Sequence, residues 1–313
     1  MSIYFDRIII GDDMNILKKI LKVLGIILLA VILFLIVDYI RLNIRYFIHK
    51  DEYEEVIDIH GNKGSDVPQG LSYSEKYDAI LQTSYSKEVS KLYVVDFTNN
   101  KLLKEYNLIN MNNSNNTKHV GGVATNDNYV WISNDYELDI YDIETVMNSD
   151  IKDLKPLKEI KIPLRGDFCY YHEGILWIGD FFLKPFYTVP NDDPLLYGYK
   201  LSEEIDYNKP DYIIHLPKMV QGMAILPDGR FVFTSSFTNL INSGLSIYKN
   251  VLEENKEEYR FDNKNLIENK KIPPMAEGIF YKDGYIHILF ENSSDKYFFA
   301  YPKINKIVKY KID

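Results

Sequence analysis

The sequence predicts an all-β fold: a β-propeller of five four-stranded blades that follows one N-terminal transmembrane α-helix. A count of six blades is the alternative. Two observations lead to this prediction, a single long apolar run near the N-terminus and a repeat of glycine-led apolar segments over the rest of the chain. Aromatic residues make up 14% of the chain, with 26 Tyr and 16 Phe. Such residues favour the half-buried, pleated surface of a β-sheet.

The apolar run covers residues 21–40 and reads LKVLGIILLAVILFLIVDYI. Only uncharged residues separate Lys22 from Asp38, and with the flanking side chains the run reaches the roughly 20 residues that cross a bilayer core of about 30 Å. A buried core helix is the alternative, but such a helix rarely runs so far without a polar stripe. The predicted division is a cytoplasmic N-terminus (1–20), a signal-anchor helix (21–40), a stalk with a possible closing strand (41–66) and the propeller (67–313).

Charges around the run are nearly balanced, because three lysines precede it and Arg41, Arg45 and Lys50 follow it. A short basic segment before an apolar core is typical of an export signal. We therefore expect a single-pass protein of the cell membrane that contacts the lipid bilayer through residues 21–40, with its N-terminus in the cytoplasm and its propeller outside. No small-x-small cleavage site follows, which favours an uncleaved anchor. Met14 is an alternative start to Met1.

The remaining chain is acidic. Residues 51–313 contain 29 basic and 41 acidic residues. This balance argues against a nucleic-acid partner, because that affinity comes largely from neutralising phosphates. Cys169 is the one cysteine, so no intrachain disulfide can form. We expect it to be a small buried residue within a strand.

The repeat has five units, each of which starts with a glycine and a short apolar strand. A polar turn and further apolar strands follow. The leading glycines are Gly70, Gly122, Gly166, Gly222 and Gly278, at intervals of about 44 to 56 residues. This interval suits one propeller blade per unit. We expect the glycines to let backbones approach one another near a central axis. Trp131 and Trp177, in matching second strands, are predicted to pack between blades.

Two ways of closing the ring remain open from the sequence. Residues 53–59 (YEEVIDI) could form the outer strand of the fifth blade. Alternatively, the fifth blade is complete in itself through residues 306–312.

Segments such as HVGGVA, VQGMAILPDGR and AEGIFYKDGYIHILFE resemble exported bacterial β-propellers of the gluconolactonase/paraoxonase-like and lactonase-repeat kind. The resemblance covers residues 67–313 and includes proteins with no settled activity. It implies a calcium ion in the central tunnel of metal-dependent members, whose inner strands usually begin Pro-Asn-Gly. Here Gln69 and Gln221 replace that Asn, and only Glu277 supplies a carboxylate. A hard dication prefers several charged or carbonyl oxygens, so the departure weakens the implied calcium site.

Polar residues that precede the inner strands are expected to gather at one end of the axis, together with residues that end the second strands. The binding candidates are Gln69, His119, Arg165, Asp167, Gln221, Glu277 and Glu291. Such a mixed ring suits a small polar ligand. The alternative is that these groups satisfy loop backbone and one another.

Two functions follow. The first is a binding or scaffold module of the cell envelope, for an unknown protein or a small polar ligand. The second is a calcium-dependent hydrolase of lactones or esters. In it, Glu277 would hold the ion with Gln69, Gln221 and either Asp167 or Asp180, and His119 would act as the base. The first is favoured because the sequence contains no complete catalytic set. The sequence leaves the ligand and the oligomeric state open.

Overall fold

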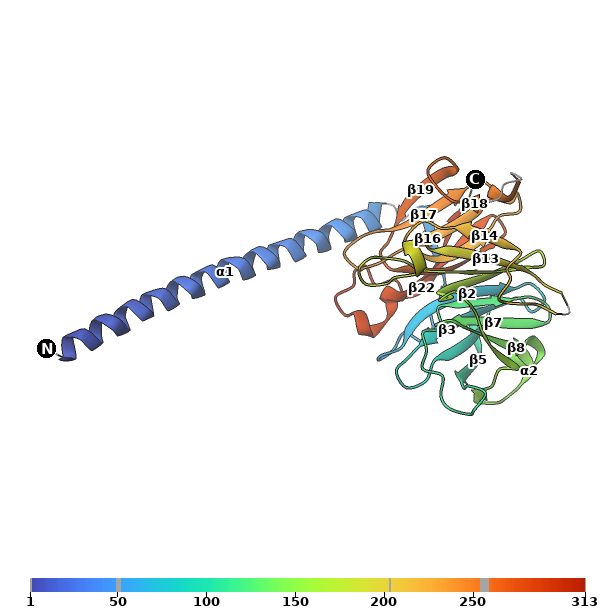
Figure 1. Cartoon of the computed structure of the whole chain (residues 1–313), viewed down its shortest axis with the longest axis horizontal. Helices are drawn as coiled ribbons and strands as arrows, with labels where there is room; N and C mark the ends of the chain where they lie inside the picture. The colour runs from blue at the N-terminus through green and yellow to red at the C-terminus, as the bar shows by residue number, and fades with distance from the viewer. Residues whose placement is uncertain (1, 49–51, 203, 254–258, 313) are drawn as a thin grey trace. The chain divides into compact units, whose positions relative to one another are not determined.

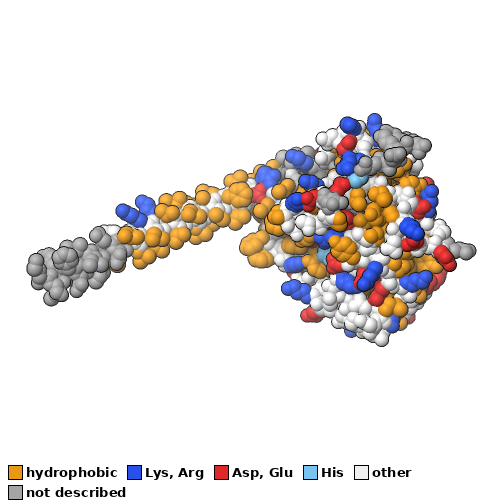
Figure 2. Space-filling view, in the orientation of Figure 1, with side chains coloured by type: hydrophobic (Ala, Val, Ile, Leu, Met, Phe, Trp, Pro, Cys, Tyr) orange, Lys and Arg blue, Asp and Glu red, His pale blue; other side chains and the backbone are white. Residues whose placement is uncertain are grey.

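A computed structural model describes residues 2–48, 52–202, 204–253 and 259–312, and it divides the chain into two units, Met1–Ile48 and His49–Asp313. The first unit is one helix, α1 (Ser2–Ile48), which extends past the expected span at both ends. Within it, the segment Met14–Arg41 contains an 18-residue window with a mean hydropathy of 3.2, and its length and composition suit a membrane span. Figure 2 shows hydrophobic side chains along this part of the helix. A signal sequence near an N-terminus has the same character.

The second unit is a five-bladed β-propeller (Figure 1), as the repeat predicted. Its five inner strands contact one another in a closed ring, in the order β2, β6, β11, β15, β20 and back to β2. Blade 1 contains β2 (Val67–Ser74), β3 (Ala79–Tyr85), β4 (Lys91–Asp96) and β5 (Lys101–Leu108), extended by β9 (Asp153–Leu154). Blade 2 contains β6 (Gly122–Thr125), β7 (Tyr129–Asn134), β8 (Glu137–Asp142) and β10 (Lys158–Lys161), and α2 (Ile143–Asn148) follows β8.

The remaining blades repeat this order from the axis outward. Blade 3 contains β11 (Phe168–His172), β12 (Ile175–Gly179), β13 (Leu195–Lys200) and β14 (Tyr212–His215), extended by β18 (Tyr259–Arg260). Blade 4 contains β15 (Val220–Ile225), β16 (Phe231–Ser235), β17 (Ser243–Tyr248) and β19 (Leu266–Ile272). Blade 5 contains β20 (Ala276–Lys282), β21 (Tyr285–Phe290), β22 (Lys306–Lys311) and β1 (Tyr53–Asp58).

The strand β1 closes the ring, which decides between the two alternatives left by the sequence. It pairs antiparallel with β22, from Tyr53 opposite Tyr310 to Asp58 opposite Lys306. Ile57 is 3% exposed and joins the apolar core between blades 5 and 1. The fifth blade is therefore completed by the N-terminal side of the propeller domain.

Replacing Ile57 with alanine tests this closure. We expect Ile57→Ala to lower the free energy of unfolding by about 3 kcal/mol, because a buried aliphatic side chain is lost from a packed core. The measurement is thermal or urea unfolding of the full chain in detergent. Glu54→Ala on the same strand is the control, since Glu54 forms an exposed ion pair with Lys309 and its loss should cost only about 0.5 kcal/mol. Equal, small effects of both changes would contradict the closure.

Apolar cores lie between neighbouring blades. Trp131 stacks on Tyr171 of blade 3 with ring centroids 5.9 Å apart, and Trp177 meets Phe231 of blade 4 at 5.7 Å. Both indoles are at most 2% exposed, so their predicted role as core between blades is confirmed. Cys169 is buried as expected, and burial raises the pKa of its thiol to about 12.

Four of the five leading glycines form a narrow waist on the axis. A Cβ on Gly122 would lie 2.3 Å from the backbone nitrogen of Cys169 in the next blade, and one on Gly278 would lie 2.4 Å from that of Leu71. A Cβ on Gly70 or on Gly222 would likewise clash with backbone atoms of the following blade. The backbones therefore touch where the glycines are, as predicted. Only about 10 Å³ of space remains at this waist, about enough for one water molecule.

The prediction for Gly166 was wrong. This glycine lies in the loop before β11, where its φ of +69° suits a residue without a Cβ. Phe168 occupies the strand position instead, and it pairs with Gly179 of β12. Other blades place a glycine opposite a hydroxyl residue, as in Gly122 with Ser133. In blade 3 the two positions are reversed, because the inner strand carries the large residue, Phe168, and the second strand carries the glycine, Gly179.

Candidate functional site

The waist separates two ends of the axis, one where the inner strands begin and one where they end in hairpins. At the first end the structure brings together three predicted residues, Gln69, Glu277 and Glu291. Gln69 Nε2 donates to Glu291 Oε2 at 3.1 Å, and the Tyr297 hydroxyl donates to the same oxygen at 3.1 Å. Glu277 is hydrogen-bonded to Glu291. These groups form a compact carboxyl cluster, and its two acids belong to blade 5.

Both acids in this cluster bind protons more tightly than exposed carboxyls. Burial raises the pKa of Glu291 to about 7. Burial raises the pKa of Glu277 further, and the charges of Glu291 and Asp167 add to that effect. Glu277 therefore holds its proton more tightly than an exposed carboxyl does, and it is the acid that donates to Glu291 in their hydrogen bond.

Arg165, Asp167 and Asp180 form a second group at the same end. Arg165 Nη2 lies 2.9 Å from Asp167 Oδ1, and the backbone N–H of Phe181 donates to Asp167 Oδ2 at 2.7 Å. The N–H of Arg165 donates to Asp180 Oδ1 at 2.8 Å. Burial raises the pKa of Asp167 to about 7 and that of Asp180 to about 6. In these contacts the polar groups of Arg165, Asp167 and Asp180 satisfy one another and the backbone of the loops.

The side chains of the last two predicted residues, His119 and Gln221, form no hydrogen bond with either group among the described residues. The His119 ring packs against Tyr85 with centroids 4.8 Å apart, and burial lowers the pKa of its imidazole to about 4. His119 is therefore neutral at physiological pH. Gln221 lines the closed waist. Binding through these residues remains a prediction.

The donors at this end do not fit the calcium ion that the resemblance implies. Both oxygens of Asp167 are already engaged, and Glu277 and Glu291 hold a proton between them. Within the described ranges, no group of three or more His, Cys, Asp or Glu side chains is placed to hold a metal. Calcium prefers six to eight oxygen ligands, several of them charged. We therefore derive no catalytic step through such an ion.

The carboxyl cluster predicts how stability changes with pH. Because the pKa of Glu291 is higher in the folded state than the ordinary value near 4.5, its stabilising effect is complete below about pH 4.5 and is lost as pH rises through about 7. Glu291→Gln keeps the acceptor for Gln69 and Tyr297 and removes the charge. We expect this variant to be more stable than the parent at pH 8 by about 1 to 2 kcal/mol.

Thermal unfolding between pH 4.5 and 8 measures this effect. The parent chain should lose stability over that interval, and Glu291→Gln should lose less. Glu268 is exposed, and its side chain forms no ion pair with the described residues. Glu268→Gln is therefore the matched control and should follow the parent. A Glu291→Gln curve parallel to the parent would show that the cluster does not hold its extra proton.

Three loops at the same end expose apolar side chains. They follow β12, β16 and β21, and they present Phe186, Ile241 and Phe299 at 69%, 62% and 72% exposure. Phe186 stacks on Phe237 of the neighbouring loop with centroids 5.8 Å apart. Exposed apolar surfaces of this kind are common where a protein contacts another molecule.

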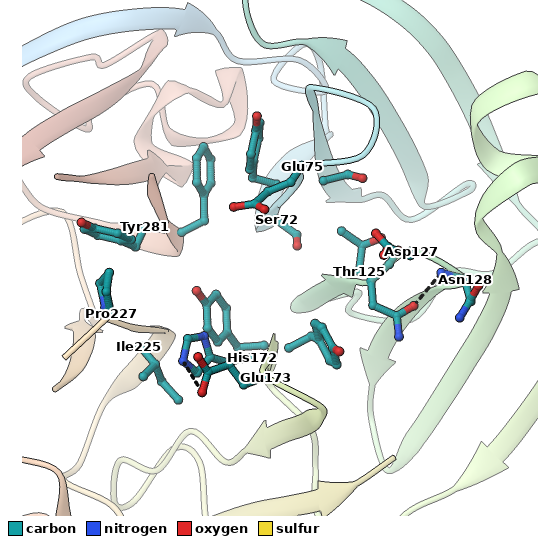
Figure 3. Close-up of a pocket in the computed structure, with 16 residues that line it drawn as sticks. Ser72, Glu75, Thr125, Asp127, Asn128, His172, Glu173, Ile225, Pro227 and Tyr281 are labelled. Carbon is teal, nitrogen blue, oxygen red and sulfur yellow. Dashed lines mark hydrogen bonds and ion pairs between the residues drawn. The ribbon is translucent and has the colours of Figure 1, made fainter. Parts of the chain in front are cut away.

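A cavity lies on the axis at the opposite end, where the inner strands finish. We call the cavity at this end the axial pocket; its volume is about 660 Å³ and all five blades contribute to it. Figure 3 shows its labelled side chains around an open space. The lining residues are Ser72, Tyr73, Ser74, Glu75, Thr125, Asn126, Asp127, Asn128, Tyr170, Tyr171, His172, Glu173, Ile225, Pro227, Phe280 and Tyr281.

Short hairpins hold the rim of this pocket in place. The N–H of Gly174 donates to the Tyr171 hydroxyl at 3.2 Å, and the N–H of Gly284 donates to the Tyr281 hydroxyl at 3.1 Å. Both glycines have positive φ, as the tight turns predicted from the sequence require. The sequence alone does not predict this pocket. The available signal was the recurrence of tyrosines just before the first hairpin turn of blades 1, 3 and 5, with polar residues at the same place in blade 2.

Comparison with solved structures supports the fold. The chain is similar to the glutaminyl cyclase of Myxococcus xanthus, with a TM-score of 0.51, 8% identity, and coverage of 83% of this chain and 97% of that one. It is also similar to the PQQ-bound aldose sugar dehydrogenase of Streptomyces coelicolor, with a TM-score of 0.48, 11% identity, and coverage of 83% and 98%.

The shared feature is the β-propeller. At identities this low, the likeness shows the fold alone, and propellers carry many unrelated activities. No family model and no curated protein matches the sequence. Function must therefore be argued from the two ends of the axis.

Proposed function

We propose that this chain is a binding module of the cell envelope, anchored by α1, whose propeller lies outside the cytoplasm and binds a small polar ligand in the axial pocket. The observation that carries the proposal is the pocket itself: about 660 Å³ of open space lined from five blades by hydroxyl, carboxyl, amide and aromatic groups. Small-molecule sites are concave, largely preformed and of this size.

The rigidity of the pocket supports this choice. Its walls are the ends of the five inner strands, and its rim is held by hydrogen-bonded hairpins. A ligand would therefore meet a preformed site and would order little of the protein on binding, which favours affinity. The carboxyl cluster at the other end is already internally satisfied through Gln69 and Tyr297.

The ligand proposal is tested by thermal unfolding of the full chain in nonionic detergent against a set of cationic, neutral and anionic polar metabolites. A true ligand should raise the unfolding temperature saturably, because it binds only the folded state. Ser72→Trp, which fills the pocket, should remove the shift. Glu75→Trp, at an exposed rim position, serves as a second blocking variant if Ser72→Trp is unstable. No saturable shift with any class of compound would overturn the proposal.

The topology is tested by thiol labelling in intact cells. The only native cysteine is buried, with a thiol pKa of about 12, so it gives little background. Asn263→Cys places a thiol at an exposed position of the propeller and should react with an impermeant maleimide before lysis. Ser2→Cys should react only after lysis. The reverse pattern would overturn the proposed orientation.

A further inference from the structure

The charged side chains of the axial pocket are all acids. Glu75, Asp127 and Glu173 line it from three different blades, and no lysine or arginine is among the described lining residues. Figure 3 shows these three carboxyl side chains on different sides of the open space. Burial lowers the pKa of His172, so that imidazole is neutral at physiological pH. The pocket therefore presents up to three negative charges and no positive one.

Two of these carboxylates have no partner that neutralises them. In the part of the chain that the structure describes, the side chains of Glu75 and Asp127 make no hydrogen bond or ion pair. Lys76, beside the rim, donates to the backbone oxygen of Asp127 at 3.3 Å, but its ion pair is with Glu144 at 2.9 Å. Lys282 is ion-paired with Asp283 at 3.3 Å. Unpaired like charges around one concave space create a potential that attracts a cation.

Aromatic rings form much of the remaining wall. Tyr73, Tyr170 and Phe280 lie on the inner strands, and the ring of Tyr73 already holds the Lys282 ammonium 4.5 Å from its centroid. Ring faces attract ammonium groups, most strongly where water is excluded. Burial raises the pKa of the Tyr170 hydroxyl to about 12, and the charge of Glu75 adds to that effect. Glu75 is therefore close enough to Tyr170 to act on it. Tyr73 and Phe280 stack on each other at 5.6 Å, and Phe280 also stacks on His287 at 4.5 Å. A cation in the pocket would therefore meet the Tyr170 ring and the carboxylates together.

The floor supplies a second kind of polar group. Ser72 and Ser74 are 5% and 4% exposed, line the pocket, and have side chains without a hydrogen-bond partner among the described residues. Figure 3 shows the Ser72 side chain directed towards the open space. A ligand that reaches these hydroxyls can form hydrogen bonds that no protein group already occupies. These oxygens can accept hydrogen bonds from N–H donors of a ligand.

We propose that the axial pocket selects an organic cation, a ligand with one or more amine groups. The ammonium lies among Glu75, Asp127 and Glu173, the carbon skeleton lies against the tyrosine and phenylalanine rings, and N–H groups donate to Ser72 and Ser74. The proposal rests on the proposed function, because it names the ligand class of the same pocket. Phosphates and carboxylic acids are excluded by repulsion from the three carboxylates.

Isothermal titration calorimetry of the full chain in nonionic detergent tests the ligand class. The probes are spermidine as an organic cation, glucose as a neutral polar compound and citrate as an anion. We expect saturable binding of spermidine that weakens as salt is raised, and no binding of citrate. Glu75→Gln/Asp127→Asn should weaken spermidine binding about tenfold, because two charges in a partly enclosed site are lost.

Two controls separate specific binding from general acidity. Glu88→Gln/Glu268→Gln removes the same net charge at exposed sites outside the lining and should leave spermidine binding unchanged. Tyr170→Phe, which keeps a ring, should bind like the parent, whereas Tyr170→Leu should weaken binding. Equal loss in both charge variants would overturn the proposal, as would binding of glucose or citrate without spermidine. Either result would overturn the organic-cation proposal but would still show that the axial pocket binds a ligand. If no compound of any class binds, the proposed function itself is overturned.

Discussion

Gly278→Ala should lower the free energy of unfolding by about 3 kcal/mol, because the added Cβ would clash with the backbone of the neighbouring blade. It would lie 2.4 Å from the nitrogen of Leu71, 2.9 Å from the oxygen of Gln69 and 2.9 Å from the carbonyl carbon of Gly70. All three atoms belong to the backbone of blade 1, so no side-chain rotation relieves the contact. Blades 5 and 1 would have to separate where the ring closes.

Urea unfolding of the full chain measures the loss, and Gly64→Ala provides the control. Gly64 has a positive φ of +62° but nothing lies within 4 Å of a Cβ built there. Its replacement should cost only the backbone strain of about 1 kcal/mol. If Gly278→Ala were no worse than Gly64→Ala, the blades would not be in contact at the waist.

The sequence predicts the number of blades and their glycines because these depend on local pattern. Apolar strands alternate with turn residues, and in four of the five units the leading glycine lies in the inner strand. The exchange at Phe168 could not be predicted this way. Its compensation, Gly179, lies on the next strand and is recognisable only when the pairing register is known. Ring closure by β1 depends likewise on a contact between the two ends of the propeller domain.

The candidate site shows a second limit of the same kind. Gln69, Glu277 and Glu291 lie together as expected from their positions before the inner strands and after a second strand, but the sequence does not show which end of the axis is open. Tyr297, from the loop between β21 and β22, reaches Glu291 and helps to satisfy the carboxyl cluster. At the other end the connections are short hairpins, which leave the axial pocket uncovered. Loop length decides which end keeps space for a ligand.

The closed waist separates the axial pocket from the carboxyl cluster at the other end of the axis. With about 10 Å³ of space between them, the two ends do not communicate through a tunnel. A ligand in the axial pocket must enter and leave by the hairpin end. Protonation of Glu291 at the far end can then affect ligand binding only through the stability of the blades, and we expect Glu291→Gln to leave ligand affinity at pH 7 unchanged.

The exchanged pair of blade 3 predicts a compensating double substitution. Gly179→Thr alone should destabilise the chain by about 3 kcal/mol, since a Cβ there would lie 2.1 Å from Cζ of the buried Phe168 ring. Phe168→Gly alone should cost at least as much, about 3 to 5 kcal/mol, because it leaves a cavity beside Trp177 and Met223.

Together the two changes recreate the arrangement of blade 4, where Gly222 pairs with Thr234 and the threonine hydroxyl donates to the carbonyl oxygen of Glu277 in the next blade at 2.7 Å. The double variant should therefore lose less than the sum of the single losses, by about 2 kcal/mol, as expected for residues in direct contact. Urea unfolding of all four proteins measures this coupling. Additive losses would mean that Phe168 and Gly179 do not share one space, and that blade 3 approaches the axis by another arrangement.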